Sequence, residues 1–352
     1  MTLARDSKIV SDCVSACVQS RDASLDLEST TPAGLAEPSR IIEQLAREDT
    51  FTADVGFALL SISSVFCTQP SEWASITSTF EARQAESVLS SGGFELTPEP
   101  LKSLLRLQLK VDLAACIVTN KPPSANLVVP SGDLMIDVDD PLGSADSCLG
   151  CLALSLRLIH FELVPMLSGF HESCLQPVGS HVSRWDRWFE LWNRCMSWFR
   201  DRPRKMKPVL ESSDEGLHHN KSFPVDVFTS AIALQANLIM HMSAVVLLSQ
   251  KPRLTNAPSA FVHLRSRSWH IQKIARMLMG NHFKEQWDPI AIATLLFIAK
   301  EMSHPSQQEA LLSCFREIST TTKIPIEQDI ANLRVRWQSI QQDGPPNPPH
   351  SS

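Results

Sequence analysis

The sequence has no tyrosine and only 12 glycines among its 352 residues. Sheet-rich proteins usually need more aromatic residues in their strands and more glycines in their turns. Because Leu, Ala and Ser are abundant instead, these shortages favour a helical fold. An excess of positive charge is also lacking, since the net charge is −6. The surface as a whole is therefore not attracted to nucleic-acid phosphates or anionic lipids.

The nine cysteines do not form a disulfide framework, because their number is odd and they are dispersed between Cys13 and Cys314. We therefore expect a reducing compartment. The first residues, MTLARDSKIVSDC, contain no apolar run of the length that a signal peptide needs.

The longest uncharged apolar stretch covers residues 227–250 and has the length of a membrane span. Gln235, Asn237 and His241 lie near its centre, where lipid strongly penalises polar side chains. We therefore predict that this stretch is a buried core helix and that the protein has no membrane partner.

Apolar residues recur at helical spacing from residue 40 onward, and prolines separate many of the runs. The pattern predicts a helix beginning at Arg40 and further helices over 51–66, 71–89, 97–120, 148–164, 184–200, 224–249, 259–279, 289–302, 306–319 and 328–341. Residues 124–146 are predicted to be an acidic loop. The predicted fold is all-α: one large domain of about ten helices over 40–341, with a loosely ordered leader (1–39) and a disordered tail (342–352).

Five segments in the second half of the chain have a characteristic order and spacing. They are RWDRWFELWNRCMSWFRDRP, FPVDVFTSAIALQANLIMHMSAVVLLSQKP, RSWHIQKIARMLMGN, DPIAIATLLFIAKEMSHPSQQEALLSCFREI and TTTKIPIEQDIANLRVRW. Together, over residues 180–340, they resemble the fungal-specific transcription-factor domain, the regulatory region of fungal zinc binuclear cluster transcription factors. The resemblance implies a nuclear regulator of a metabolic gene set, with secondary-metabolite biosynthesis as the suggested case.

The sequence departs from that family at its N-terminal side. A binuclear zinc cluster needs six cysteines that begin as C-x2-C-x6-C, but three residues separate Cys13 from Cys17 and the next cysteine is Cys67. The basic linker that normally follows the cluster is also missing. We therefore expect contact with DNA only indirectly, through a homo- or heterodimer with a DNA-binding regulator.

One basic segment stands out between two predicted helices. It contains Arg200, Arg202, Arg204, Lys205 and Lys207. Two interpretations stay open: a nuclear-import or phosphate-binding patch, or a connector at a helix C-terminus, where cations suit the helix dipole.

A second candidate site lies on the apolar helix and the helix after it. Met240, His241, Met242 and Trp269 are candidate lining residues of an effector pocket, although a hydrogen-bonded core histidine is the more ordinary interpretation of His241.

The remaining clusters are interpreted as structural. They are the tryptophan stripe Trp185, Trp188 and Trp192, the pair Cys148 and Cys151, the acidic residues Asp137, Asp139 and Asp140, and the loop histidines His218 and His219. Helical spacing favours core packing for the tryptophans and cysteines. No glycine-rich phosphate loop or G-x-S-x-G elbow is present, so no catalytic residue, metal site or cofactor is predicted.

Two alternatives to a transcriptional regulator stay open at this point. One is an all-helical enzyme acting on an apolar metabolite. The other is a truncated product of a zinc-cluster transcription-factor gene. A cleft with convergent polar groups of perturbed pKa would favour the enzyme.

Overall fold

The computed structural model describes residues 65, 68–74, 77, 99–121, 123, 141–158, 184–211, 225–249, 262–283 and 287–342. The predicted leader, the helices predicted to begin at residues 40 and 51 (apart from Val65), and residues 343–352 of the predicted tail lie outside them.

The described residues form an all-α structure, as the composition predicted. Its eight α-helices are α6 (Glu99–Thr119), α7 (Pro141–Arg157), α9 (Arg184–Asp201), α10 (Ala231–Ser249), α11 (Arg267–Met279), α12 (Pro289–Ala299), α13 (Pro305–Thr322) and α14 (Glu327–Gln342). Short 3-10 turns cover Pro70–Glu72, Arg204–Met206 and Val262–Arg265. The strands β1 (Leu210–Glu211) and β2 (Asp226–Val227) pair antiparallel.

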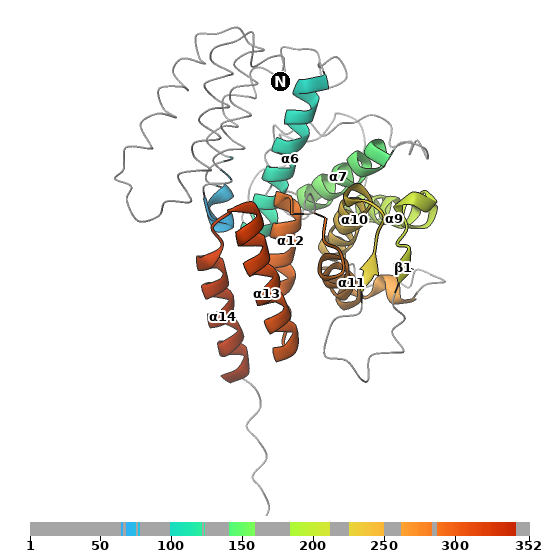
Figure 1. Ribbon diagram of the computed structural model, residues 1–352. Coiled ribbons are helices and arrows are strands. Elements are labelled where there is room, and N and C mark those ends of the chain that lie inside the picture. Colours follow the sequence, from blue (N-terminus) through green and yellow to red (C-terminus); the bar gives the residue numbers. More distant parts are fainter. Residues whose placement is uncertain are drawn as a thin grey trace, which may run out of the picture.

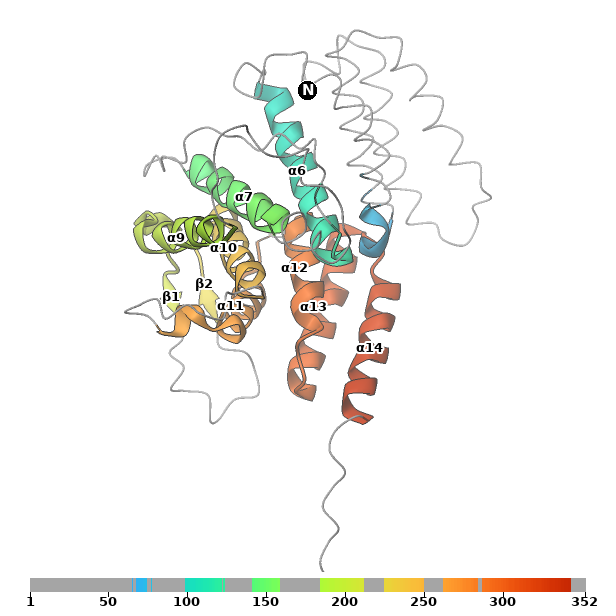
Figure 2. The same cartoon turned by 180° about the vertical axis from the view of Figure 1, so that it is seen from behind.

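Helix α10 lies at the centre of this arrangement (Figure 1). It packs against α7, α9, α11 and α12, and α12 in turn packs against α6, α11 and α13. Seen from behind, α7 and α9 cover one side of α10, while α12, α13 and α14 form a separate row (Figure 2). The described structure therefore has one helix that is covered by others along most of its length.

The central position of α10 follows from its residues, which are apolar on every face. Among the described helices it is the one long and apolar enough, by length and composition alone, to cross a membrane, yet 78% of its apolar window is buried inside the protein. Its buried polar side chains are satisfied internally: the Asn237 amide donates to the carbonyls of Met206 (2.7 Å) and Ala233 (2.8 Å). It is a core helix in this structure, as predicted for residues 227–250.

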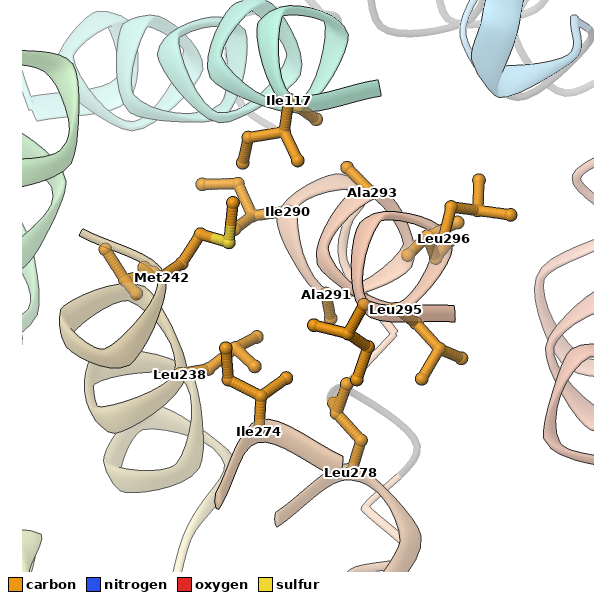
Figure 3. Close-up of a cluster of buried hydrophobic side chains, with 14 of the residues drawn as sticks. Ile117, Leu238, Met242, Ile274, Leu278, Ile290, Ala291, Ala293, Leu295 and Leu296 are labelled. Atoms are coloured by element: carbon orange, nitrogen blue, oxygen red, sulfur yellow. The ribbon is translucent and has the colours of Figure 1, made fainter. Parts of the chain in front are cut away.

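The packing around α10 and α12 consists of interlocking aliphatic side chains (Figure 3). The labelled residues come from four helices: Ile117, Leu238, Met242, Ile274, Leu278, Ile290, Ala291, Ala293, Leu295 and Leu296. All are nearly inaccessible to solvent. Helix α12 fits here because small alanines let neighbouring helices approach closely.

Three predicted helix starts are wrong by seven or more residues. Helix α7 begins at Pro141, so the last six residues of the predicted 124–146 loop are helical. Proline is favourable in the first turn of a helix. Ser144, in the same turn, is buried and accepts a hydrogen bond from Trp198 Nε1 at 3.0 Å. The predicted start at Cys148 therefore missed the first two turns of this helix.

The other two errors lie at the starts of α10 and α11. Residues 226–227, predicted to be helical, instead form β2 by pairing with β1. Helix α11 begins at Arg267 rather than near residue 259, because the Ser266 side chain caps it by accepting from Trp269 N at 3.2 Å.

Replacing Leu238 with alanine is expected to lower the free energy of unfolding by about 2–5 kcal/mol, because the deletion leaves a cavity in a closely packed core. Ile232→Ala on the same helix is the matched control, since the Ile232 side chain is 41% exposed. We expect this control to cost less than about 1 kcal/mol. Urea denaturation followed by circular dichroism measures both losses. Equal losses would contradict the burial of α10.

Candidate functional site

A pair of buried histidines joins α10 to α11. Nδ1 of His241 lies 2.7 Å from Nδ1 of His270, and both side chains are buried. Nε2 of His270 lies 2.8 Å from the carbonyl oxygen of Leu264. Because a carbonyl only accepts, His270 carries its proton on Nε2. Its Nδ1 is then the acceptor in the neutral ring, so His241 donates from Nδ1.

The surroundings of His241 favour a neutral ring. Burial lowers the pKa of His241 well below its ordinary value, and His270, Arg202 and Lys273 act in the same direction. Phe199 and Trp269 flank the His241 ring at centroid distances of 5.6 and 5.5 Å. Adding a proton would place a charge in a site that is removed from water and close to two cations, which is unfavourable.

A buried ion pair connects α11 to the paired strands β1 and β2, which we call the hairpin. Lys273 Nζ lies 3.1 Å from Asp226 Oδ2 and also contacts Glu211. Burial raises the pKa of Asp226, and the attraction of Lys273 opposes that rise. The ammonium group also lies 5.6 Å from the centroid of the Trp269 ring, so it links the hairpin to the histidine pair.

Backbone contacts hold the hairpin in this position. Asn281 accepts from Phe228 N at 2.9 Å and donates to the Asp226 carbonyl at 2.7 Å. A Cβ on Gly280 would meet Val225 Cγ1 at 2.1 Å, so only glycine permits this close approach. The polar cluster, which we define as half-buried Arg202 and buried Asp226, His241, His270 and Lys273, is therefore held between α10, α11, the hairpin and the residues that follow α9.

The basic segment after α9 is divided between surface and interior. Arg200, Arg204, Lys205 and Lys207 are exposed, and Arg200 pairs with Asp201 at 2.8 Å. Arg202 is half-buried, and its guanidinium carbon lies 3.8 Å from the centroid of the Phe199 ring. Burial lowers the pKa of Arg202 to about 10. The five residues predicted as one patch thus do not share one face.

The four candidate effector-pocket residues also face different surroundings. His241 and Trp269 lie together in and beside the polar cluster. Met242 points into the aliphatic core (Figure 3). Met240 lines a small cavity between α7 and α9. The divergence of Met240 and Met242 follows from helical geometry, because residues two apart lie on nearly opposite faces.

The tryptophan stripe attaches α9 to α10. Trp188 stacks on Trp192 with centroids 5.6 Å apart, and its Nε1 donates to the Leu247 carbonyl at 2.9 Å. Both side chains belong to a small apolar cluster, so they pack as core residues. The side chain of Trp185 lies outside the described part of α9.

Of the other clusters interpreted as structural, the cysteine pair lies within the described residues, and the acidic and histidine clusters lie outside them. Cys148 and Cys151 are buried on one face of α7, near Cys195 of α9. Asp137, Asp139, Asp140, His218 and His219 lie outside the described residues. Within the described ranges, no group of three or more His, Cys, Asp or Glu side chains is arranged to hold a metal ion.

Sequence reasoning missed His270, Lys273 and Asp226. A pattern that could have revealed the first two is their spacing: residues 270, 273, 274 and 277 occupy one face of α11, where Ile274 and Met277 are buried. Polar residues at core-facing positions indicate a buried polar network. No sequence pattern indicated that Asp226 is buried, because its burial depends on the pairing of β2 with β1.

No family model matches the chain, and neither the curated proteins nor the solved structures include a significant match. Membership of the fungal-specific transcription-factor family therefore stays a prediction.

The histidine pair makes stability depend on pH. The pKa of His241 is lower in the folded protein than in the unfolded chain, whose histidines titrate near pH 6.5. Its contribution is thus fully present above about pH 6.5 and is lost as the pH falls below that value. We expect the free energy of unfolding, measured by urea titration, to fall by about 1 kcal/mol between pH 6.5 and 5.5.

His241→Gln should remove this part of the pH dependence, because its amide can donate to His270 but does not titrate in this range. His282→Gln is the matched control, since the His282 side chain is 79% exposed. The control should keep the pH slope of the original protein. If His241→Gln keeps it as well, the histidine pair is not its source.

Proposed function

We propose that the protein is a transcriptional regulator that acts in the nucleus through contacts with other proteins and controls a metabolic gene set. Secondary-metabolite biosynthesis is the suggested case. The observation that carries the proposal is that the five segments of the family resemblance form most of α9 to α14 and the strand β2, which belong to one connected body. A resemblance spread over unrelated surface loops would carry less weight.

Specific residues of these segments hold consecutive parts of the body together. Trp188 of the first segment donates to Leu247 of the second. Asn281 of the third donates back to Asp226 of the second. Trp337 of the last donates to Ala299 of the fourth at 2.9 Å. The resembling residues are thus those that determine the packing, which supports homology of the whole helical body rather than of one short motif.

The mechanism that we propose uses this body to present a surface to a partner. In this proposal, DNA is reached through a DNA-binding partner in a homo- or heterodimer. Exposed Arg204, Lys205 and Lys207 follow α9 and would serve nuclear import or bind phosphate. Binding of an effector would shift which surface is presented.

The rival proposal, an enzyme for an apolar metabolite, has less support. The cavity that includes Met240 has a volume of about 110 Å³. Pockets for drug-sized ligands measure roughly 300–1,000 Å³. His241 and His270 use their facing nitrogens to bond each other, and Met242 lies in the aliphatic core. These residues therefore favour a structural role over substrate binding.

Tethering the full chain to an unrelated DNA-binding domain tests the proposal. In a fungal host carrying a reporter with that domain's binding site, we expect transcription to change at least threefold, up or down, relative to the DNA-binding domain alone. The reason is that a regulatory body recruits its partners wherever it is placed. Reporter transcript level is the measurement.

The core variant Leu238→Ala and the surface variant Ile232→Ala are the matched controls for folding. Ile232→Ala should keep the effect, and Leu238→Ala should weaken it in proportion to its loss of folded protein. A reporter level equal to that of the DNA-binding domain alone, at equal protein level, would contradict a regulatory role.

A further inference from the structure

A small cavity lies where α7, α9 and α10 meet. Its lining consists mainly of apolar and sulfur-containing side chains: Ser147, Cys148, Cys151, Arg194, Cys195, Ser197, Trp198 and Met240. The side chain of Arg194 is 41% exposed, so the cavity reaches the surface beside it. With a volume of about 110 Å³, it is smaller than a cavity of roughly 150 Å³ that holds benzene. Only a very small molecule fits.

Two of the cavity's thiols come from opposite sides of the helix interface. Cys151 of α7 and Cys195 of α9 both line the cavity, and both are buried in the same small apolar cluster. All three cavity cysteines are free thiols in this structure. Cys148 lies one turn before Cys151 on the same helix, so it competes with Cys195 as a neighbour of Cys151.

The environment makes these thiols unequal. The hydrogen bond from Cys195 lowers the pKa of Cys151, and Arg194 acts in the same direction against the effect of burial. The same bond, together with burial, raises the pKa of Cys195. Burial raises the pKa of Cys148 well above its ordinary value. Since the thiolate is the nucleophile, the lowered pKa favours Cys151 as the attacking thiol.

We propose that this cavity is an oxidation site for a small hydroperoxide, at which Cys151 and Cys195 become joined by a disulfide between α7 and α9. The inference does not depend on the proposed regulatory function. It rests on the placement of both thiols at one cavity and in one packed cluster, on the size of the cavity and on the cation beside it.

The reaction balances in two steps. The Cys151 thiolate attacks one peroxide oxygen, an S–O bond forms and the O–O bond breaks, which gives a sulfenic acid and an alkoxide that takes up the proton released by Cys151. Cys195 sulfur then attacks the Cys151 sulfur, an S–S bond forms and the S–O bond breaks. The leaving hydroxide takes the Cys195 proton and becomes water. Two thiols are oxidised by two electrons, and the hydroperoxide is reduced to an alcohol and water.

The expected consequence is a link between the two helices that cover one side of α10. Cys151 and Cys195 both belong to the small apolar cluster that contains Trp188 and Leu247. A bond there would hold α9 against α7 whenever the chain meets an oxidant. This makes the packing over α10 sensitive to redox conditions.

Peptide mapping of the full chain tests the proposal. The reduced protein is treated with a tenfold excess of hydrogen peroxide, alkylated, digested and analysed by mass spectrometry without reduction. We expect most molecules to contain a cross-link between the peptides of Cys151 and Cys195. Cys314 is the internal control: burial raises its pKa to about 12 and it lies outside the cavity, so it should stay reduced.

Variants identify the partners. Cys195→Ser should remove the cross-link and let dimedone trap the Cys151 sulfenic acid, whereas Cys148→Ser should leave the cross-link intact. The bulky cumene hydroperoxide should react at least tenfold more slowly than hydrogen peroxide, because it exceeds the cavity. Cys151 and Cys195 that stay reduced, a Cys148–Cys151 bond instead, or equal rates for the two peroxides would overturn the proposal. The mapping of the unsubstituted chain decides the matter even if a variant fails to fold.

Discussion

Helix α10 has apolar residues on every face, so it must be covered on every side, and the rest of the described structure follows from that requirement. Helices α7 and α9 cover one side, α11 and α12 cover others, and α6 packs behind α12. A covering helix needs an apolar stripe that faces α10. In α9 this stripe includes Trp188 and Trp192, which pack in one cluster with Leu247 of α10. Burial of aliphatic surface at roughly 25 cal/mol per Å² is the main stabilising contribution.

Because α10 is buried, each of its polar side chains lowers the stability of the fold unless that side chain is hydrogen-bonded. Asn237 is satisfied by two carbonyls, and His241 by the ring of His270. Through Lys273 and Asp226, the network continues to the hairpin. Buried polar contacts favour one arrangement of the elements that carry them, because a shift would leave a polar group without its partner. The histidine pair and the ion pair of Lys273 with Asp226 therefore help to determine how α10, α11 and the hairpin are oriented.

The sequence predicted the helical class, most helices and the central position of α10, because apolar periodicity reports burial directly. It did not predict contacts between distant residues. The packing of Cys151 and Cys195 in one cluster and the pairing of Leu210 with Val227 depend on the tertiary arrangement. Among the residues of the polar cluster, His241 was identified from its position in an apolar run, but its hydrogen-bond partner His270 was not identified. The start of α7 was missed because the loop-like composition around Pro141 concealed a helical turn.

Native-state hydrogen exchange of the full chain tests most directly whether α10 is the covered centre of the fold. If it is, the amides of residues 236–247 exchange only through global unfolding, with an opening free energy equal to that from urea denaturation. Amides at the C-terminal end of α14, where many side chains are exposed, should exchange much faster. Exchange of the α10 amides as fast as those of α14, or protection of α10 only after lipid vesicles are added, would contradict the central role of this helix.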